Sequence, residues 1–579
     1  MGLLLPFQPA AADYPNHLAL PRPERLRLPP AGWLLTAMVL LCLAPRAMMA
    51  LRITSVCPDG VLYIHAAKAI ESGNLHMAFR DLDLNTYPII LAALHRLGLD
   101  WELAAGLWGV TISSLVVLPL WGWARRQFDD RVALLACMLY AVHPKFIEWS
   151  PEVMRDPTFW MLFMLAIYWM WRAVTEVRHR YFLAAGVAII LASLTRVEGL
   201  FLLIPLVLWT FWRWRALAPA WLALGPEKVP GTFCAKHPKG RSGKRFLAPF
   251  PAFPARGKLL LGVVLCVVIF PALLLLVNIA WLHGRHGWTL LRLDPLERVQ
   301  PWLEHLFGQA PADGGNSPAA SMTVGRMAWV FFPTMTRGLS PIFALLMFGG
   351  IWGWRRVWSR RDHQPLFYTA VVIMCGIWIH LWYGQNICPR YALPIVLMAS
   401  PLAALGLLGL VARLSRVAEW FRRRVRPDTI ATVVFGVIFA ANLTAAMTSS
   451  RAYFAGRRTA VDVGHWVLRE FPRPTVLAGP LGVTPIVSYY AAESPYRAFR
   501  CDAKDEFILK MIENSRADVV LFRPAKQLTE DRCAALVERS RRLGMAPVRP
   551  DAMPTDEPGF IILVRATRKD LVETPLHPP

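Results

Sequence analysis

Four short polar segments of the sequence contain the residues whose types could do chemistry. They combine carboxylates, which can accept protons, with cationic groups, which bind anions. The first segment, CPDGVLY at 57–63, has the single acid Asp59. The other candidates are Glu152, Arg155 and Asp156 in SPEVMRDP with Lys145 nearby, Arg196 and Glu198 in LTRVEGL, and Arg390 and Tyr391 in CPRYALP.

Each segment also has a purely structural explanation. A lone Asp beside a proline is a common helix N-cap. The arginines could snorkel to a membrane interface or form structural ion pairs. A shared site is favoured by placement, because all four segments lie at the ends of apolar runs or in short loops between them. If these loops share one side of a membrane, their polar side chains collect on one face.

The elements that must position these residues are long apolar runs. Hydrophobic residues make up 55% of the 579-residue chain, against about 45–50% in soluble domains. Runs of about 20 residues, enough to cross a hydrocarbon core of ~30 Å, recur from Ala31 to Met447 and then stop. A large soluble enzyme would need charged faces at helical spacing, which these runs lack. We therefore predict a polytopic α-helical membrane protein.

The basic residues indicate the orientation of the chain. The net charge of +24 could suggest nucleic acid as a partner, but the cations gather in short clusters at the ends of the runs, as cytoplasmic loops do. We therefore expect no nucleic acid partner, and we expect these cations to contact membrane lipids. The clusters are Arg22, Arg25 and Arg27; Arg125, Arg126 and Arg131; Arg172, Arg178 and Arg180; Arg355, Arg356, Arg360 and Arg361; and Arg413, Arg416, Arg422, Arg423, Arg424 and Arg426.

Placing these clusters in the cytoplasm predicts a multi-pass protein of the plasma (inner) membrane with about eleven helices and a C-terminus outside. Loops 52–86 and 283–338 then lie outside. The run at 182–212 is interrupted by TRVEG at 195–199, which predicts two short helices meeting at an outward turn. The other predicted spans are 31–51, 101–123, 132–144, 157–173, 258–282, 340–356, 366–384, 390–412 and 429–447.

Three parts of the chain differ from the predicted transmembrane domain at 31–447. Residues 1–30 are a Pro-rich basic cytoplasmic tail, and 214–257 are a flexible cytoplasmic insertion rich in Pro, Gly and Lys. Residues 448–579 predict a small extracytoplasmic α/β domain with a largely parallel sheet, because strands alternate with helices. Its predicted strands are 475–479, 517–522 and 560–564, and its predicted helices are 461–471, 484–491, 507–514 and 530–543. It has no GxGxxG motif and no P-loop, so nothing in it indicates nucleotide binding.

The nine cysteines form no CxxC pair, so no zinc knuckle is indicated. Four of them would face the oxidising side, where a disulfide could form. These are Cys57, Cys388, Cys501 and Cys533, and their pattern does not assign a pairing.

The order of these segments resembles the C-type (GT-C) superfamily of polytopic membrane glycosyltransferases. The resemblance is to bacterial relatives of protein O-mannosyltransferases and lipid A aminoarabinose transferases in particular. It covers about residues 31–410 and depends on order and spacing, since each motif is short. The matching features are Asp59 with Tyr63 four residues later, the ESGN helix end, NTYPIILAALHRLG, SPEVMRDP, LTRVEGLFLLIP and PRYALPIVLMASPL.

This resemblance implies transfer of a sugar from a polyprenyl-phosphate-linked donor to a lipid, glycan or protein acceptor on the extracytoplasmic face, with inversion. The phosphate leaves as a stable anion, so a base and cations suffice. By position Asp59 corresponds to the catalytic base, and Glu152 and Asp156 to a second acidic site. The resemblance makes Arg196, Arg390, Tyr391 and Lys145 candidates for binding the donor phosphate or sugar, with Tyr63 and Glu198 as accessory residues.

One departure bears on metal binding. Many relatives have a second acidic residue directly after the first-loop Asp, and this chain has Gly60 there. We expect no required cofactor and no dedicated metal site, although Asp59, Glu152 and Asp156 could bind a divalent cation.

Two other functions share the predicted topology. An O-antigen ligase or polymerase would depend on Arg and His residues of the late outer loop, here His283, Arg285, His286, Arg292, Arg298 and His305. A flippase or transporter of polyprenyl-linked substrates would favour polar residues at the bilayer midplane and repeated broken helices. The polar residues here collect at one face, and no internal repeat is seen. Loss of Asp59 would spare a ligase and inactivate the transferase.

Overall fold

The computed structural model describes residues 31–53, 55–80, 82, 84–216, 252–269, 272, 324–353, 364–384, 388–420, 427–471, 475–501, 503–524, 528–548, 560–565 and 567. The predicted tail at 1–30, most of the insertion at 214–257 and the late-loop residues His283, Arg285, His286, Arg292, Arg298 and His305 lie outside the described residues.

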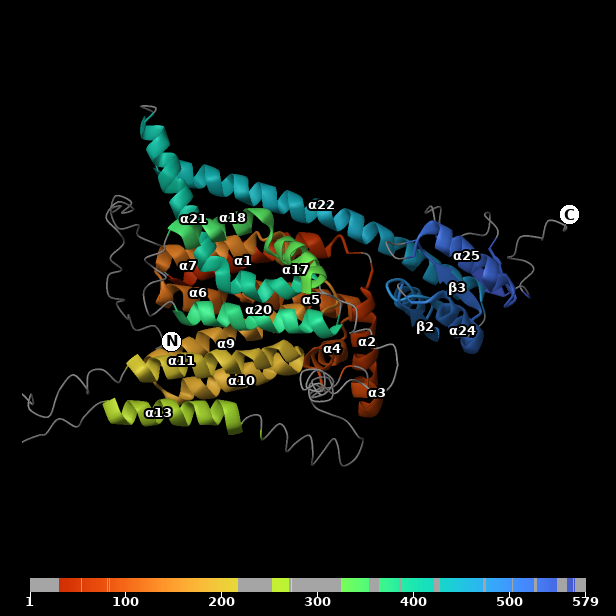
Figure 1. The fold of residues 1–579 in the computed structure, drawn as a ribbon, viewed down its shortest axis with the longest axis horizontal. Coiled ribbons are helices and arrows are strands. Elements are labelled where there is room, and N and C mark those ends of the chain that lie inside the picture. The colour runs from red at the N-terminus through yellow and green to blue at the C-terminus, as the bar shows by residue number, and fades with distance from the viewer. Residues whose placement is uncertain are drawn as a thin grey trace, which may run out of the picture.

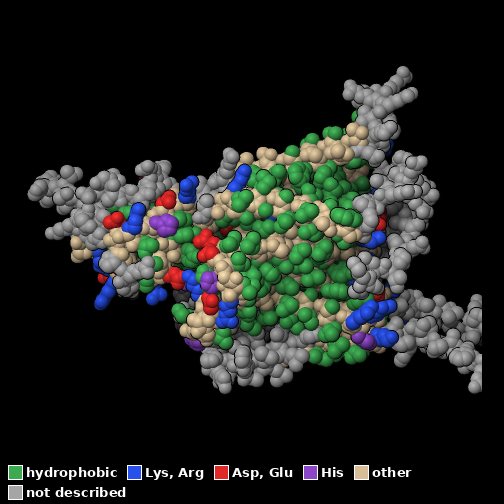
Figure 2. Space-filling model, turned by 180° about the vertical axis from the view of Figure 1, so that it is seen from behind, with side chains coloured by type: hydrophobic (Ala, Val, Ile, Leu, Met, Phe, Trp, Pro, Cys, Tyr) green, Lys and Arg blue, Asp and Glu red, His purple; other side chains and the backbone are tan. Residues whose placement is uncertain are grey.

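A bundle of roughly parallel helices forms most of the described protein (Figure 1). Figure 2 shows hydrophobic side chains over the middle of this bundle and charged side chains gathered at its ends, as a membrane-spanning belt requires. The bundle helices are α1 (Ala31–Ala50), α5 (Trp101–Leu115), α6 (Val117–Gln127), α7 (Asp130–Ala141), α9 (Asp156–Glu176), α10 (His179–Thr195), α11 (Leu203–Ala216), α13 (Ala252–Val264) with the π-helix η2 (Leu265–Ile269), α17 (Val324–Leu339), α18 (Pro341–Gly353), α20 (Gln364–Gly384), α21 (Leu393–Trp420) and the first part of α22 (Pro427–Glu470).

Within the described ranges, five helical segments are long and apolar enough to cross a bilayer. They are Gly32–Ala50, Trp101–Gln127, Val197–Arg215, Pro389–Ala418 and Thr429–Ser449. Ala328–Leu339 and Pro341–Gly353 together would make a sixth, bent by 93°. The polytopic membrane fold is thus confirmed, and the total of about eleven helices stays a prediction. The prediction of an outer loop at 283–338 was wrong for its last part, because residues 324–338 belong to helix α17.

The predicted interruption near Arg196 is present. Helix α10 ends at Thr195, and Arg196 has extended backbone angles. The short 3₁₀ helix η1 (Val197–Leu202) then leads into α11. The break sets Arg196 and Glu198 at a helix junction, which spares their charges a place in the middle of an apolar helix.

The predicted polar loop at 52–86 is a layer of short helices at one end of the bundle. It consists of α2 (Pro58–Glu71) and α3 (Leu75–Arg80), and α4 (Thr86–Arg96) follows directly. The short helix α8 (Pro144–Trp149) immediately precedes the SPEVMRDP segment. A separate small core holds this layer, formed by Val56, Val61, Ile64, Tyr87, Leu91, Trp101 and Val153 among others. The layer is therefore a rigid support for Asp59 and not a flexible loop.

Helix α22 connects the bundle to the C-terminal domain (Figure 1). It has 44 residues, which makes it roughly 66 Å long. It runs without a break through residue 448, where the sequence pattern divides the chain. Its last turns pack against the sheet through Val463, Trp466 and Val467.

The C-terminal domain is a five-stranded sheet in the order β2-β1-β3-β5-β4 with helices on both faces. Strand β1 is parallel to β2 and β3, whereas β5 is antiparallel to β3 and β4. The expectation of a largely parallel sheet was therefore wrong for half of the pairings. The elements are β1 (Leu477–Pro480), α23 (Thr484–Tyr490), β2 (Tyr496–Phe499), α24 (Asp505–Ser515), β3 (Val519–Phe522), α25 (Glu530–Arg541), β4 (Met545–Pro547) and β5 (Ile561–Arg565).

Candidate active site

Asp59 lies in the first turn of α2 and does not cap the helix. The N-cap is Cys57, whose Sγ accepts a hydrogen bond from the backbone N–H of Gly60 at 3.2 Å. The Asp59 side chain is 44% exposed. The capping explanation is therefore wrong, and the carboxylate is available to other partners.

Gly60 is required where α2 meets the SPEVMRDP loop. A Cβ atom at this position would lie 2.7 Å from the Cβ of Val153 and 2.9 Å from its carbonyl oxygen. The Cys57 thiol also contacts that carbonyl, at 3.4 Å. A side chain at position 60 would therefore require Val153 to move.

Arg390 joins Asp59 from the opposite end of the sequence. It lies in η6 (Pro389–Ala392), at the entrance to α21. Its Nη2 donates to Asp59 Oδ2 at 2.8 Å, and its Nη1 contacts the Met154 sulfur at 3.5 Å. Its Nε is buried without a hydrogen-bond partner. The guanidinium thus keeps at least its Nε–H for another acceptor.

Arg196 forms a second, more enclosed ion-pair group. It donates to Asp156 Oδ1 and to Glu198 Oε1, both at 2.7 Å. Its guanidinium also lies 4.9 Å from the centre of the Tyr391 ring. Asp156, Arg196, Glu198, Arg390 and Tyr391 line one small cavity, together with aromatic and aliphatic side chains of the bundle. Five of the residues that the sequence singled out therefore meet.

Arg155 is an additional cation beside this group. Its guanidinium lies 5.9 Å from the centre of the Tyr63 ring, and its Nε is buried without a hydrogen-bond partner. In the part of the chain that the structure describes, it has no ion pair. The sequence analysis named Arg155 but predicted no role for it. Its position between Glu152 and Asp156 was the feature that could have indicated one.

Glu152 is separated from Asp156 although both belong to the same loop. Both of its carboxylate oxygens accept hydrogen bonds from Arg457 of α22, at 3.0 and 2.9 Å. The side chain is 1% exposed, and burial raises the pKa of Glu152 while Arg457 opposes that shift. The predicted second acidic site is therefore divided. Arg457 was not foreseen, because it lies some 300 residues away in the predicted C-terminal domain.

Lys145 does not join the cluster either. Its Nζ donates to Glu148 Oε2 at 2.6 Å, and the Ser449 hydroxyl of α22 donates to the same oxygen at 3.2 Å. Lys145 and Glu152 both lie outside the cavity lined by Arg196 and Arg390. Their contacts tie the loop to α22.

Among the described residues, neither a disulfide nor a group of metal-ligating side chains is found at this site. Cys57, Cys388, Cys501 and Cys533 are all free thiols, and burial raises the pKa of Cys57. Among the described residues, no three His, Cys, Asp or Glu side chains are grouped as a metal site would need. The set of Asp59, Glu152 and Asp156 in particular is not gathered, since Glu152 faces Arg457.

A protein family matches the central part of this site. The family is described as dolichyl-phosphate-mannose-protein mannosyltransferase, and its model matches residues 86–225. That range includes Glu152, Asp156, Arg196 and Glu198. No curated protein matches the chain.

Solved structures match nearly the whole chain at low sequence identity. ArnT from Cupriavidus metallidurans in the apo state is 14% identical with a TM-score of 0.50, covering 94% of this chain and 99% of that chain. The same protein solved bound to undecaprenyl phosphate gives a TM-score of 0.49 at 14% identity, covering 92% and 98%. The oligosaccharyltransferase of Archaeoglobus fulgidus is 13% identical with a TM-score of 0.48, covering 84% of this chain and 69% of that chain.

The arabinofuranosyltransferase AftD from Mycobacteria is 12% identical with a TM-score of 0.41, covering 93% of this chain and 40% of that chain. Sequence identities this low show a shared fold and no more. The match that shows it here is the one with apo ArnT. Together with the family match at 86–225, this shared fold agrees with the expected resemblance to the GT-C superfamily of membrane glycosyltransferases.

Proposed function

We propose that this protein transfers a sugar from a polyprenyl-phosphate-linked donor to an acceptor hydroxyl on the extracytoplasmic face of the plasma membrane, with inversion at the anomeric carbon. The observation that carries the proposal is the Asp59–Arg390 pair, a half-exposed carboxylate held by an arginine at the end of the bundle. The family match supports the donor class, because its name specifies a sugar on a polyprenol-type phosphate.

The cations beside Asp59 suit the donor phosphate. Arg390 and Arg155 each have a buried Nε without a hydrogen-bond partner. A phosphate oxygen could fill these positions with charge-assisted hydrogen bonds, which are stronger than neutral ones. Arg196 is already paired with the two carboxylates Asp156 and Glu198, so we assign it to shaping the cavity and not to binding the phosphate directly.

Asp59 and Arg390 then have complementary roles. When a phosphate takes the Arg390 guanidinium, the Asp59 carboxylate is released to face the acceptor. It accepts the proton of the acceptor hydroxyl as that oxygen bonds to the anomeric carbon. The bond between that carbon and the phosphate oxygen breaks, and its electron pair leaves with the phosphate. The nearby guanidinium groups stabilise the charge that develops there.

The remaining candidates act at a distance in this proposal. Tyr391 packs on Arg196, and Tyr63 packs under Arg155. Glu152 and Lys145 hold the loop against α22 and do not touch the donor. No cofactor is part of the proposal, and the acceptor is a lipid, glycan or protein.

The test is the transfer rate of Asp59→Asn and Asp59→Glu. The protein, purified in detergent, would receive radiolabelled polyprenyl-phosphate sugars extracted from the host cells. We expect the Asn variant to lose about 10²–10⁴-fold in rate, because an amide cannot accept the proton. Mass spectrometry of glycolipids and glycoproteins from cells with and without the protein would first identify the product.

Glu71→Gln is the matched control, because Glu71 lies on the same helix and pairs with His95 away from the site. It should transfer at the normal rate. Near-normal transfer by Asp59→Asn at matched thermal stability would contradict the proposal and favour the ligase alternative.

A further inference from the structure

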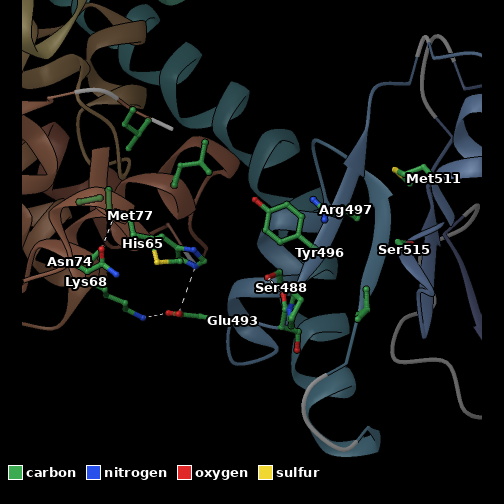
Figure 3. A pocket seen from close by; sticks show the side chains of 18 of the residues that line it. His65, Lys68, Asn74, Met77, Ser488, Glu493, Tyr496, Arg497, Met511 and Ser515 are labelled. Carbon is green, nitrogen blue, oxygen red and sulfur yellow. Dashed lines mark hydrogen bonds and ion pairs between the residues drawn. The ribbon is translucent and has the colours of Figure 1, made fainter. Parts of the chain in front are cut away.

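A second, larger cavity lies between the layer of short helices (α2, α3 and α4) and the C-terminal domain (Figure 3). Its volume is about 1440 Å³. One wall is a face of α2 and the start of α3, and the other is formed by β2 and α24. Asp59, Asp156, Arg196 and Arg390 do not line it, so it is distinct from the site described above.

The charges in this cleft are unbalanced. Glu493 of the C-terminal domain forms an ion pair with Lys68 of α2, across the cleft (Figure 3). Arg497 and Lys510 also line the cavity, and neither has an ion-pair partner in the part of the chain that the structure describes. His65 lies 3.9 Å from Glu493, but burial lowers its pKa, which disfavours its charged form. Two positive charges are left for a ligand.

The other polar groups of the cleft are hydroxyls and amides. Ligand pockets for small molecules usually measure about 300–1,000 Å³, so this one accommodates more than a single sugar. Side chains of this kind hydrogen-bond to sugar hydroxyls in any of several orientations. They are Ser72, Asn74, Ser494, Tyr496, Asn514 and Ser515. The three serine hydroxyls donate to backbone carbonyls, so they offer a ligand their acceptor lone pairs.

The cleft reaches the transfer site along α2. Leu62 lines the cleft and lies three residues after Asp59, which places the two side chains roughly 5–6 Å apart at Cβ on the helix surface. From Asp59 to Ser72 the helix rises roughly 20 Å. A ligand that fills the cleft can therefore hold one group at Arg497 or Lys510 and present another at Asp59.

We propose that this cleft binds the acceptor and that it selects an anionic saccharide. Arg497 and Lys510 contact a phosphate or carboxylate group that is remote from the hydroxyl that reacts. The saccharide is either a free glycan or the head group of a glycolipid, since both present the same chemistry to the cleft. This inference rests on the proposed function, because it takes Asp59 as the point of transfer.

Equilibrium binding to the full-length protein in nanodiscs tests the proposal. The probes are a fluorescent octagalacturonide, which bears carboxylates, and fluorescent maltooctaose, which is neutral. We expect wild-type protein to bind the anionic probe at least about tenfold more tightly, and R497Q/K510Q to lose that preference, since a hydrogen bond to a charged group contributes about 1.5–3 kcal/mol. R541Q/R542Q on α25 removes two cations away from the cleft and should leave the preference intact.

Two further arms separate the alternatives. The octagalacturonide attached to a lipid in the nanodisc should bind more tightly than the free probe if the source is a glycolipid, and equally if it is a free glycan; either result supports the proposal. Equal binding of the anionic and neutral probes, an unchanged preference in R497Q/K510Q, or tighter binding of hexaglutamate would overturn it. Because binding needs no turnover, Asp59→Asn should keep it, and a failure of the catalytic proposal would be seen separately in the transfer assay.

Discussion

At the scale of single residues, the two arginines of the candidate site differ in the number of carboxylates that they bind. Arg196 is bracketed by Asp156 and Glu198 and is 5% exposed. Arg390 has one carboxylate partner and an unused Nε, and it is 18% exposed. Two residues of the same type therefore differ in what they can offer a donor phosphate.

We expect Arg390→Ala to weaken donor use more than folding. The donor KM should rise by about tenfold or more, because a charge-assisted contact to phosphate is lost. Arg390→Lys should recover only part of it, since an ammonium cannot reproduce the guanidinium geometry. Transfer rates across a range of donor concentrations, with thermal unfolding in detergent, would measure both effects.

Arg196→Ala is the comparison for that experiment. It should lower the unfolding temperature more than Arg390→Ala does, because it leaves the buried Asp156 and the half-buried Glu198 without their partner. Wild-type turnover of Arg390→Ala at low donor concentration would reduce Arg390 to a structural partner of Asp59.

At the scale of elements, the loop that contains Glu152 and Asp156 is held from two sides. Helix α2 packs against Val153 through Gly60, and α22 holds Glu152 through Arg457. The loop also supplies Met154 to Arg390 and Asp156 to Arg196. A displacement of α22 is therefore transmitted to the residues around Asp59.

We expect the Glu152–Arg457 pair to position this loop. Arg457→Met should lower both thermal stability and transfer rate, because removing one partner of a buried pair costs about 3–5 kcal/mol. The double variant E152M/R457M should recover much of the stability, since no buried charge is left alone. Comparison of the donor KM with kcat would show whether transfer recovers along with stability.

The neighbouring Arg458 provides the control. It lies on the same helix with an exposed side chain, so Arg458→Met should change neither stability nor transfer. If Arg457→Met behaved like Arg458→Met, α22 would not position the loop.

At the scale of the whole molecule, the layer formed by α2, α3 and α4 and the C-terminal domain contact each other at one end of the bundle. The Val56 N–H donates to the Tyr490 hydroxyl, which in turn donates to Glu102, and Lys68 pairs with Glu493. The hydrophobic belt in Figure 2 separates this end from the opposite one.

This arrangement predicts the results of reporter fusions. A reporter after Gly240, in the basic insertion, should be cytoplasmic, whereas reporters after Ser72 and Pro550 should be extracytoplasmic. Paired alkaline phosphatase and green fluorescent protein fusions would measure this, because each is active on one side only. Finding Gly240 and Pro550 on the same side would contradict the predicted topology.

The sequence by itself determined the membrane fold and the segments that contribute to the site. Apolar length is a local property, so the runs that begin near Ala31 and Trp101 could be recognised as spans without their neighbours. The break at Arg196 was equally local, because charges interrupt an apolar helix wherever it packs. The resemblance to GT-C enzymes rested on the order of such segments.

Only the tertiary structure decided which charges meet. Asp59 and Arg390 are 331 residues apart, and Glu152 and Arg457 are 305 apart, so no spacing pattern could join them. The packing of the helices decides whether a carboxylate is accessible or is bound by a buried arginine. For this reason Glu152, which binds Arg457, is separated from Asp156, which binds Arg196. The antiparallel half of the sheet was missed for the same reason, because strand direction follows from the path of the chain and not from the composition of a strand.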